Sequence, residues 1–248
     1  MTSPHTDALT FVLVHGAWHG GWCWSRTAHI LRQQGHTVFT PTQTGLGERS
    51  HLLGAGITLD TFVQDIIKVL DYENLHNVTL VGHSFGGLTI TGVADQRAAR
   101  IAQLVYLDAF ILGSGISTFD TLPAAVIDKM TAAAHALNPQ APAVPAPKPA
   151  SLGLSRPEDL EFMTGRLTPQ PLGVYETSLT LEHPVGNGLP ATYIQCTDPV
   201  FSAVQGSFEW VKAHTDWKVE QLATGHDAMV SAPEELARLL VRVASASC

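Results

Sequence analysis

One serine, placed between glycines directly after an apolar run, constrains this chain more than any other feature. The run Val78-Thr79-Leu80-Val81 has strand character, and Gly82-His83-Ser84-Phe85-Gly86 follows it at once. In a G-x-S-x-G turn between a strand and a helix, the serine stands on strained backbone and its glycine neighbours prevent collisions. The pattern predicts that Ser84 is a nucleophile; the alternative is a glycine-rich structural turn.

Short β-branched runs alternate with helical patterns along most of the chain, which predicts right-handed crossovers and a mostly parallel sheet flanked by helices. Ligand sites in such sheets lie at the carboxyl ends of the strands. The expected strands are 10–15, 36–40, 78–82, 103–108, 191–196 and 217–222, and the expected helices are 22–34, 59–73, 85–96, 200–213 and 233–245.

The alternation breaks between residues 111 and 190. This stretch contains the Pro/Ala-rich segment 138–149, which should be extended, with short helices near 121–135 and 156–165. We interpret 111–190 as a cap inserted into a core made of 1–110 and 191–248, all within one compact domain. A cap would cover the site and set substrate choice. The alternative is a surface excursion that does not contact the site.

Composition narrows the class of partner. Hydrophobic residues make up 45% of the 248 positions, and the net charge is −8 with only 14 Lys and Arg. Few cations argue against a nucleic acid or an anionic membrane as partner, so a small-molecule ligand is expected. The N-terminus has no signal-peptide pattern, and the three cysteines form no C-x-x-C motif. These features predict a cytoplasmic protein; they leave the oligomeric state open.

A serine hydroxyl needs a base, and that base needs a carboxylate to orient it. In this kind of fold both follow the serine in sequence, the acid first and the histidine second. His226 follows the last predicted strand and is the expected base. Asp198, after the strand 191–196, is the expected acid, although an Asp-Pro turn or a helix cap is the alternative role. Asp108 is the rival acid, and Asp227 is a weaker candidate.

Acyl transfer also requires donors for the developing oxyanion. The expected donors are the backbone amides of Phe85 and of Ala17, which lies in the loop after the first strand. The histidines around these loops lack the spacing of a metal site, so no metal is predicted. The candidate substrate-pocket residues are Trp18, Phe110, Phe119 and Met229, and the last three could equally be core.

Four segments together resemble the α/β-hydrolase superfamily, in the branch of plant methylesterases, hydroxynitrile lyases and bacterial carboxylesterases of the pyrethroid-hydrolase type. They are 15–24 (HGAWHGGWCW), 44–51 (TGLGERSH), 81–87 (VGHSFGG) and 105–110 (VYLDAF). The resemblance implies an α/β-hydrolase fold with a small helical cap, a Ser84–His226–Asp198 triad, oxyanion donors from Ala17 and Phe85, and no cofactor. It implies a serine carboxylesterase acting on small apolar or aromatic esters.

Two other functions stay open in the sequence. Lyases of this branch resemble one another in having a lysine after the base and a threonine in the oxyanion loop, whereas this chain has Asp227 and Gly16 there. Because no cation would then stabilise cyanide, an esterase is favoured over a hydroxynitrile lyase. A receptor-like hydrolase that binds its ligand and turns it over slowly would have the same triad.

Overall fold

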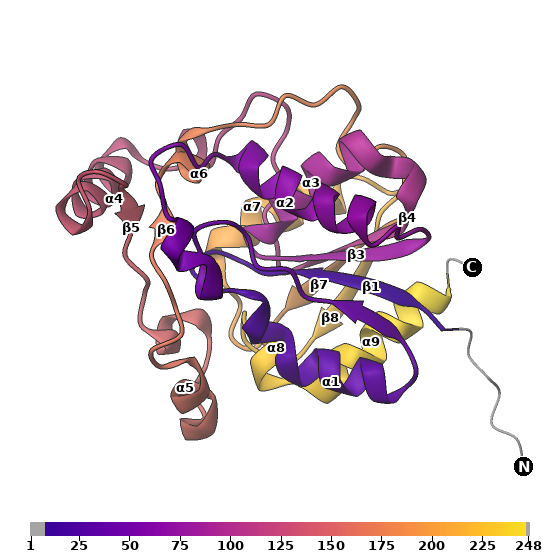
Figure 1. The fold of residues 1–248 in the computed structure, drawn as a ribbon. Helices are drawn as coiled ribbons and strands as arrows, with labels where there is room; N and C mark the ends of the chain where they lie inside the picture. The colour runs from indigo at the N-terminus through magenta and orange to yellow at the C-terminus, as the bar shows by residue number, and fades with distance from the viewer. Residues whose placement is uncertain (1–7, 247–248) are drawn as a thin grey trace, which may run out of the picture.

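A six-stranded parallel sheet forms the centre of residues 8–246, the part of the chain that the computed structural model describes (Figure 1). The strand order is β2-β1-β3-β4-β7-β8. The predicted strands are confirmed to within two residues at each end. Their bounds are β1 Thr10–Val14, β2 Thr37–Phe39, β3 Val78–His83, β4 Ile101–Leu107, β7 Ala191–Cys196 and β8 Lys218–Leu222.

Helices cover both faces of this sheet. In Figure 1, α1 and α9 lie below the sheet, and α2 and α3 lie above it. The helices of the sheet layers are α1 Ser25–Gln33, α2 Leu59–Tyr72, α3 Gly86–Arg97, α7 Gln205–Lys212, α8 Ala228–Ser231 and α9 Pro233–Ser245. The predicted helix at 22–34 begins instead as a 3-10 turn, Gly21–Trp24, and becomes α-helical at Ser25.

Local sequence explains where the long helices begin. Thr58 and Thr61 form a reciprocal capping box at the start of α2, and the apolar stripe of that helix is buried. Helix α9 begins with Pro233, whose missing N–H costs nothing at a first helical position, and Glu234 and Glu235 occupy its positive end.

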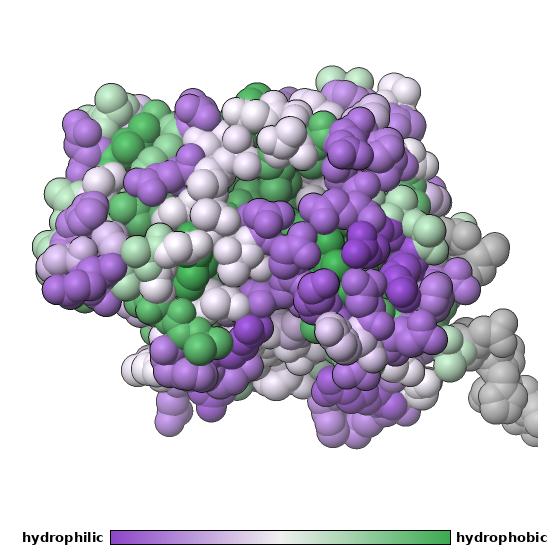
Figure 2. All heavy atoms as spheres, turned by 45° about the horizontal axis from the view of Figure 1, so that its top comes forward, coloured by the Kyte–Doolittle hydropathy of each residue, from purple (hydrophilic) through white to green (hydrophobic). Residues whose placement is uncertain are grey.

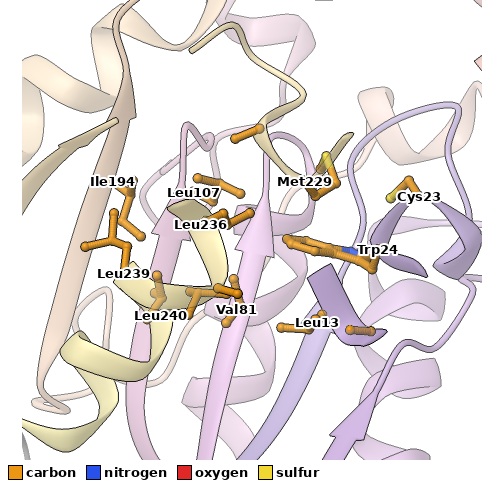
Figure 3. Close-up of a cluster of buried hydrophobic side chains, with 14 of the residues drawn as sticks. Leu13, Cys23, Trp24, Val81, Leu107, Ile194, Met229, Leu236, Leu239 and Leu240 are labelled. Atoms are coloured by element: carbon orange, nitrogen blue, oxygen red, sulfur yellow. The ribbon is translucent and has the colours of Figure 1, made fainter. Parts of the chain in front are cut away.

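The core consists of one apolar layer on each face of the sheet. Strand β1 shows the division, since Phe11 and Leu13 belong to one layer while Val12 and Val14 belong to the other. Figure 3 shows the first layer, in which residues of α9 pack against the strands beside Trp24. The strands β3 and β7 are buried along their whole length, so the central part of the sheet is covered on both faces.

The segment between β4 and β7 carries the remaining elements, which Figure 1 shows at the left of the sheet. They are α4 Ala124–Leu137, α5 Pro157–Met163, α6 Gly173–Glu176 and the two-stranded antiparallel ribbon of β5 Ala143–Val144 and β6 Gln170–Pro171. Apolar side chains reach the surface on this side in Figure 2, and Val126 and Leu137 of α4 are exposed. Across residues 8–246, none of the helices has the length and apolar character needed to cross a bilayer.

Candidate active site

Ser84 lies at the tip of a tight turn between β3 and α3. Its φ of 52° is in the left-handed region, which only strained or specially supported residues adopt. A Cβ on Gly82 would stand 2.7 Å from the carbonyl oxygen of Gly86, and one on Gly86 would stand 2.7 Å from the carbonyl oxygen of His15. The turn is braced by two hydrogen bonds, from Ser84 N–H to the Leu107 carbonyl at 3.1 Å and from Phe110 N–H to the Ser84 carbonyl at 3.0 Å.

His226 lies between a hydroxyl and a carboxylate. Its Nε2 is 2.9 Å from Ser84 Oγ, and its Nδ1 is 2.7 Å from Oδ2 of Asp108. All three side chains are buried, with Ser84 the most accessible at 7% exposed. An Nδ1–H donated to the carboxylate leaves the Nε2 lone pair facing the hydroxyl, which is the arrangement that allows an imidazole to take a proton from serine.

The structure does not bring the predicted acid, Asp198, to His226. Asp198 is exposed on the turn after β7, where its N–H donates to the Thr224 carbonyl at 3.0 Å. In the described part of the chain, no hydrogen bond or ion pair joins Asp198 to His226. Asp108, the rival acid, holds that place because β4 lies directly beside β3 in the sheet.

Backbone geometry also orients Asp108. Its φ is 42°, its N–H donates to the Ile194 carbonyl at 2.7 Å, and its Oδ1 accepts from Cys196 N–H at 3.2 Å. The carboxylate is thus fixed on one oxygen by β7 and on the other by His226. A carboxylate with both oxygens hydrogen-bonded is a rigid support for an imidazole.

A cavity of about 420 Å³ opens over this group, and Ala17 and Phe85 line it beside Ser84. The neighbouring amide, that of Trp18, is already engaged, since it donates to Oε1 of Gln170 at 3.0 Å. Trp18 has a φ of 66°, so the loop turns sharply right after Ala17. Both residues that carry the expected oxyanion donors therefore line the cavity together with Ser84.

Of the four predicted pocket residues, the structure brings two to the cavity. Trp18 and Phe110 line it, whereas Phe119 stacks behind Tyr175 with the ring centroids 5.8 Å apart. Met229 lies in the core layer beside Trp24 and Leu236 (Figure 3). Phe119 and Met229 thus pack in apolar core clusters and do not line this cavity.

Most of the cavity wall comes from residues that sequence reasoning missed. The apolar ones come from the segment between β4 and β7 and from the loop after β7, and the others are polar or small. The missed residues are Thr118, Thr121, Leu122, Val126, Met130, Tyr175, Phe201, Ala203 and Gly206. No short motif marks them, although the six from Thr118 to Tyr175 lie in the expected cap, which is a partial signal.

Behind the site lies a group of buried histidines with one acid. His19 Nδ1 donates to the Ala17 carbonyl at 2.6 Å, and His19 Nε2 is 3.2 Å from Oδ2 of Asp227. Burial alone would lower the pKa of His19, but the Asp227 carboxylate and the Ala17 carbonyl outweigh it, so the pKa is raised. His83 has the opposite shift, since burial and the neighbouring His226 hold its pKa well below 6.5.

Donor atoms of His83, His226 and Asp227 lie within 4.8 Å of one another, close enough to suggest a metal site. Both ring nitrogens of His226 already face Asp108 and Ser84, however, and Nε2 of His83 donates to the His226 carbonyl at 3.0 Å. These contacts explain the cluster as a hydrogen-bonded support for the loop that carries His226.

Comparison with known proteins shows which family this chain belongs to. The model of the alpha/beta hydrolase family matches residues 11–239. A carbendazim hydrolyzing esterase from Nocardioides sp. (strain SG-4G) is 40% identical over 236 residues, which is 93% of this chain and 97% of that protein. An alpha-hydroxynitrile lyase from Arabidopsis thaliana is 39% identical over 103 residues, 41% of this chain and 40% of its own length.

The fold itself recurs in solved structures. An extracellular alpha/beta-hydrolase from a Paenibacillus species, described as sharing homology with tobacco salicylic acid binding protein 2, superposes with a TM-score of 0.81 at 24% identity. The match covers 95% of this chain and 98% of that one. The chain therefore belongs to the alpha/beta hydrolase family, as a carboxylic ester hydrolase.

Proposed function

We propose that this chain is a serine carboxylesterase that hydrolyses small apolar or aromatic esters through an acyl-enzyme. The observation that carries the proposal is the continuous pair of contacts from Ser84 Oγ to His226 Nε2, 2.9 Å, and from His226 Nδ1 to Asp108, 2.7 Å. The predicted catalytic residues Ser84 and His226 are kept, and Asp108 replaces Asp198 as the acid.

In this mechanism Ser84 Oγ attacks the ester carbonyl while His226 takes the hydroxyl proton. Asp108 keeps the proton of the resting imidazole on Nδ1 and stabilises the imidazolium that forms. The imidazolium then gives its Nε2 proton to the leaving alkoxide, which departs as the alcohol and leaves the acyl group on Ser84. A water, deprotonated by His226, attacks the acyl-enzyme and releases the acid.

The negative charge of each tetrahedral intermediate forms beside the backbone of Ala17 and Phe85. We propose the amides of these two residues as the oxyanion donors. Their support is that both residues border the cavity at Ser84, whereas the adjacent Trp18 amide is committed to Gln170. Donors that are fixed before the reaction stabilise this charge without reorganisation.

The cavity supports a small substrate with an aromatic or branched apolar group. Its wall includes the rings of Phe85, Phe110, Tyr175 and Phe201, and about 420 Å³ suits a ligand at the small end of the range for such sites. The relative from Nocardioides is named for carbendazim, an aromatic compound, so carbendazim belongs among the first compounds to test.

We further propose that residues 111–190 act as the cap of this site, since Val126 and Met130 of α4 line the cavity.

A cytoplasmic location is also proposed. Two buried thiols that form no disulfide, Cys23 and Cys196, support a reducing compartment. The proposed partner is the small-molecule ester, with no nucleic acid or membrane partner, as the net charge of −8 suggests.

The decisive experiment compares the wild type with Ser84→Ala. We expect the wild type to hydrolyse p-nitrophenyl acetate, butyrate and benzoate, and Ser84→Ala to lose at least about a thousandfold in kcat. A fluorophosphonate probe should label Ser84 and no other residue, as mapped by peptide mass spectrometry. Turnover that survives Ser84→Ala removes the proposed nucleophile, while labelling without turnover indicates the receptor-like alternative.

The lyase alternative has its own assay in mandelonitrile. The residue after the base is Asp227, fully buried and paired with His19, so the structure offers no cation there for a departing cyanide. We therefore expect no cyanide release from mandelonitrile above the uncatalysed rate. Release that depends on Ser84 would establish the lyase activity instead.

A further inference from the structure

We propose that Phe201 is a positioning residue whose ring face stabilises the imidazolium form of His226 during catalysis. The inference rests on the proposed role of His226 as the base. The two rings stack with their centroids 3.9 Å apart and their planes 23° from parallel. His226 thus has a phenyl face over its ring plane in addition to the hydrogen bonds at its two nitrogens.

The physical basis is the charge distribution of the phenyl ring. Its face is negative and attracts a cation centred within about 6 Å, whereas a neutral imidazole gains only ordinary stacking energy. In the catalytic cycle the imidazolium forms when Ser84 gives up its proton, in the transition states and tetrahedral intermediates. An interaction that strengthens at that stage raises kcat and not merely substrate affinity.

None of the other described groups in contact with His226 presents a phenyl face to its imidazole. Asp108 after β4 bonds Nδ1, Ser84 lies at Nε2, and His83 of β3 lies 4.6 Å away between ring centroids. Burial and the charge of a protonated His226 hold the pKa of His83 well below 6.5, so that ring stays neutral. Two further titratable groups approach the loop itself.

The first of these is Cys196 of β7, whose Sγ faces the His226 carbonyl at 3.9 Å. Burial raises the pKa of that thiol, which therefore carries no charge. The second is Asp227, next to His226 in sequence, which pairs with His19. Asp108 is thus the charged partner in direct contact with the imidazole, and Phe201 adds a second stabilising contact from a different direction.

The backbone on both sides of Phe201 is held in place. A bridge pairs Thr197 with Val200 just before it, and the 3-10 turn Ser202–Val204 follows it, closed by Val204 N–H to the Phe201 carbonyl at 3.4 Å. The ring is only partly buried and also lines the cavity. A test must therefore separate an electrostatic action on His226 from simple contact with substrate.

Fluorinated phenylalanines make that separation, because each added fluorine weakens the negative ring face and changes the ring shape little. We would place 4-fluoro-, 3,5-difluoro- and pentafluorophenylalanine at position 201 and follow the imidazole of His226 by NMR titration. In the same proteins we would measure kcat for p-nitrophenyl butyrate across pH. The same substitutions at Phe110, which lines the cavity elsewhere, are the matched control.

We expect the pKa of His226 and log kcat to fall in step with fluorination at position 201, with kcat reduced about tenfold in the pentafluoro variant. Because the ring favours the protonated form, a weaker ring moves the acid limb of the profile to lower pH. The Phe110 series should alter KM and leave the pKa of His226 in place.

Unchanged NMR titration across the 201 series overturns the inference, as does an equal shift in the Phe110 series. This readout needs no turnover, so it stands apart from the proposed function. Failure of the fluorophosphonate probe to label Ser84 would reject the esterase mechanism while leaving the titration of His226 to judge Phe201.

Discussion

Oδ2 of Asp108 lies 2.7 Å from Nδ1 of His226, although 118 residues separate the two in sequence. The acid follows β4, the strand next to the one that carries Ser84, and the exposed Asp198 two places along the sheet order takes no part in this contact. This relationship leads to the first prediction.

Asp108→Asn should reduce kcat about 10³- to 10⁴-fold, because an amide no longer holds the proton on Nδ1 and leaves the imidazole in the wrong tautomer. Asp198→Asn is the matched control and should stay within about twofold of wild type, as expected for a surface residue. Steady-state kinetics on p-nitrophenyl butyrate measures both. The reverse ranking of the two variants would restore Asp198 as the acid.

Gly16→Ala should lower both kcat and the free energy of unfolding. A Cβ at Gly16 would lie 2.8 Å from Cβ of Ser84 and 2.9 Å from Nδ1 of His83, so the oxyanion loop must move away from the nucleophile. Overpacking of this size costs about 1–3 kcal/mol, and we expect kcat to fall at least about tenfold with KM little changed.

Gly56→Ala is the control for that substitution, since a Cβ there meets nothing within 4 Å. Gly56→Ala should leave kcat unaltered and should not lower the free energy of unfolding. Equal kinetics for Gly16→Ala and wild type would show that the loop tolerates the extra methyl group.

Stability should decrease in acid because of His15. Burial lowers the pKa of this imidazole to about 3, despite the opposing hydrogen bond with the Gly16 carbonyl. The pKa of His15 in the folded protein lies below its value of 6.5 in the unfolded chain. The stability that depends on the neutral ring is therefore fully present above pH 6.5 and is lost as the pH falls toward 3. The free energy of unfolding should drop by up to about 1.4 kcal/mol per pH unit in that window.

Urea titrations from pH 7 to pH 4 test this, with His15→Gln expected to show a shallower slope than wild type. The exposed His51→Gln serves as the control and should follow the wild-type curve. Parallel slopes for wild type and His15→Gln would mean that another group dominates acid unfolding.

Replacing only one member of the His19–Asp227 pair should strongly lower the free energy of unfolding. Both side chains are almost completely buried, and Asp227→Asn leaves a cationic imidazole without its partner. We expect a loss of about 3–5 kcal/mol of unfolding free energy, with the double variant His19→Gln/Asp227→Asn losing less than the sum of the two single changes.

This pair also has a pH signature. The folded pKa of His19 is raised, so its stabilisation is present below pH 6.5 and disappears as the pH rises through the folded value. The free energy of unfolding of each variant is measured by chemical denaturation. If the loss in the double variant equals the sum of the losses in the two single variants, the two side chains do not interact.

The features that could be predicted from the sequence are those set by a few neighbouring residues. The glycines around Ser84 and the strand before it fix the nucleophile turn, and the apolar periodicity of α2 and the proline and acids of α9 fix those helices to within about a residue. These features need no knowledge of distant contacts, because steric and capping effects act over a few residues.

The contacts of the predicted acid and of the predicted pocket residues depend on which strands are neighbours and on which way each side chain points. Asp108 and Asp198 both follow strands at the same sheet edge, and only the order β3-β4-β7 decides which carboxylate meets His226. Phe119 and Tyr175 stack on each other, and the sequence does not say which of the two rings faces the cavity. Such choices are made by tertiary packing.

With Asp108 as the proposed acid, the turn at residues 198–200 has no assigned part in proton transfer. The proposal therefore predicts that substitutions at the exposed Asp198 and Pro199 leave hydrolysis intact, whereas Val200 pairs with Thr197 and helps to hold Phe201 in place.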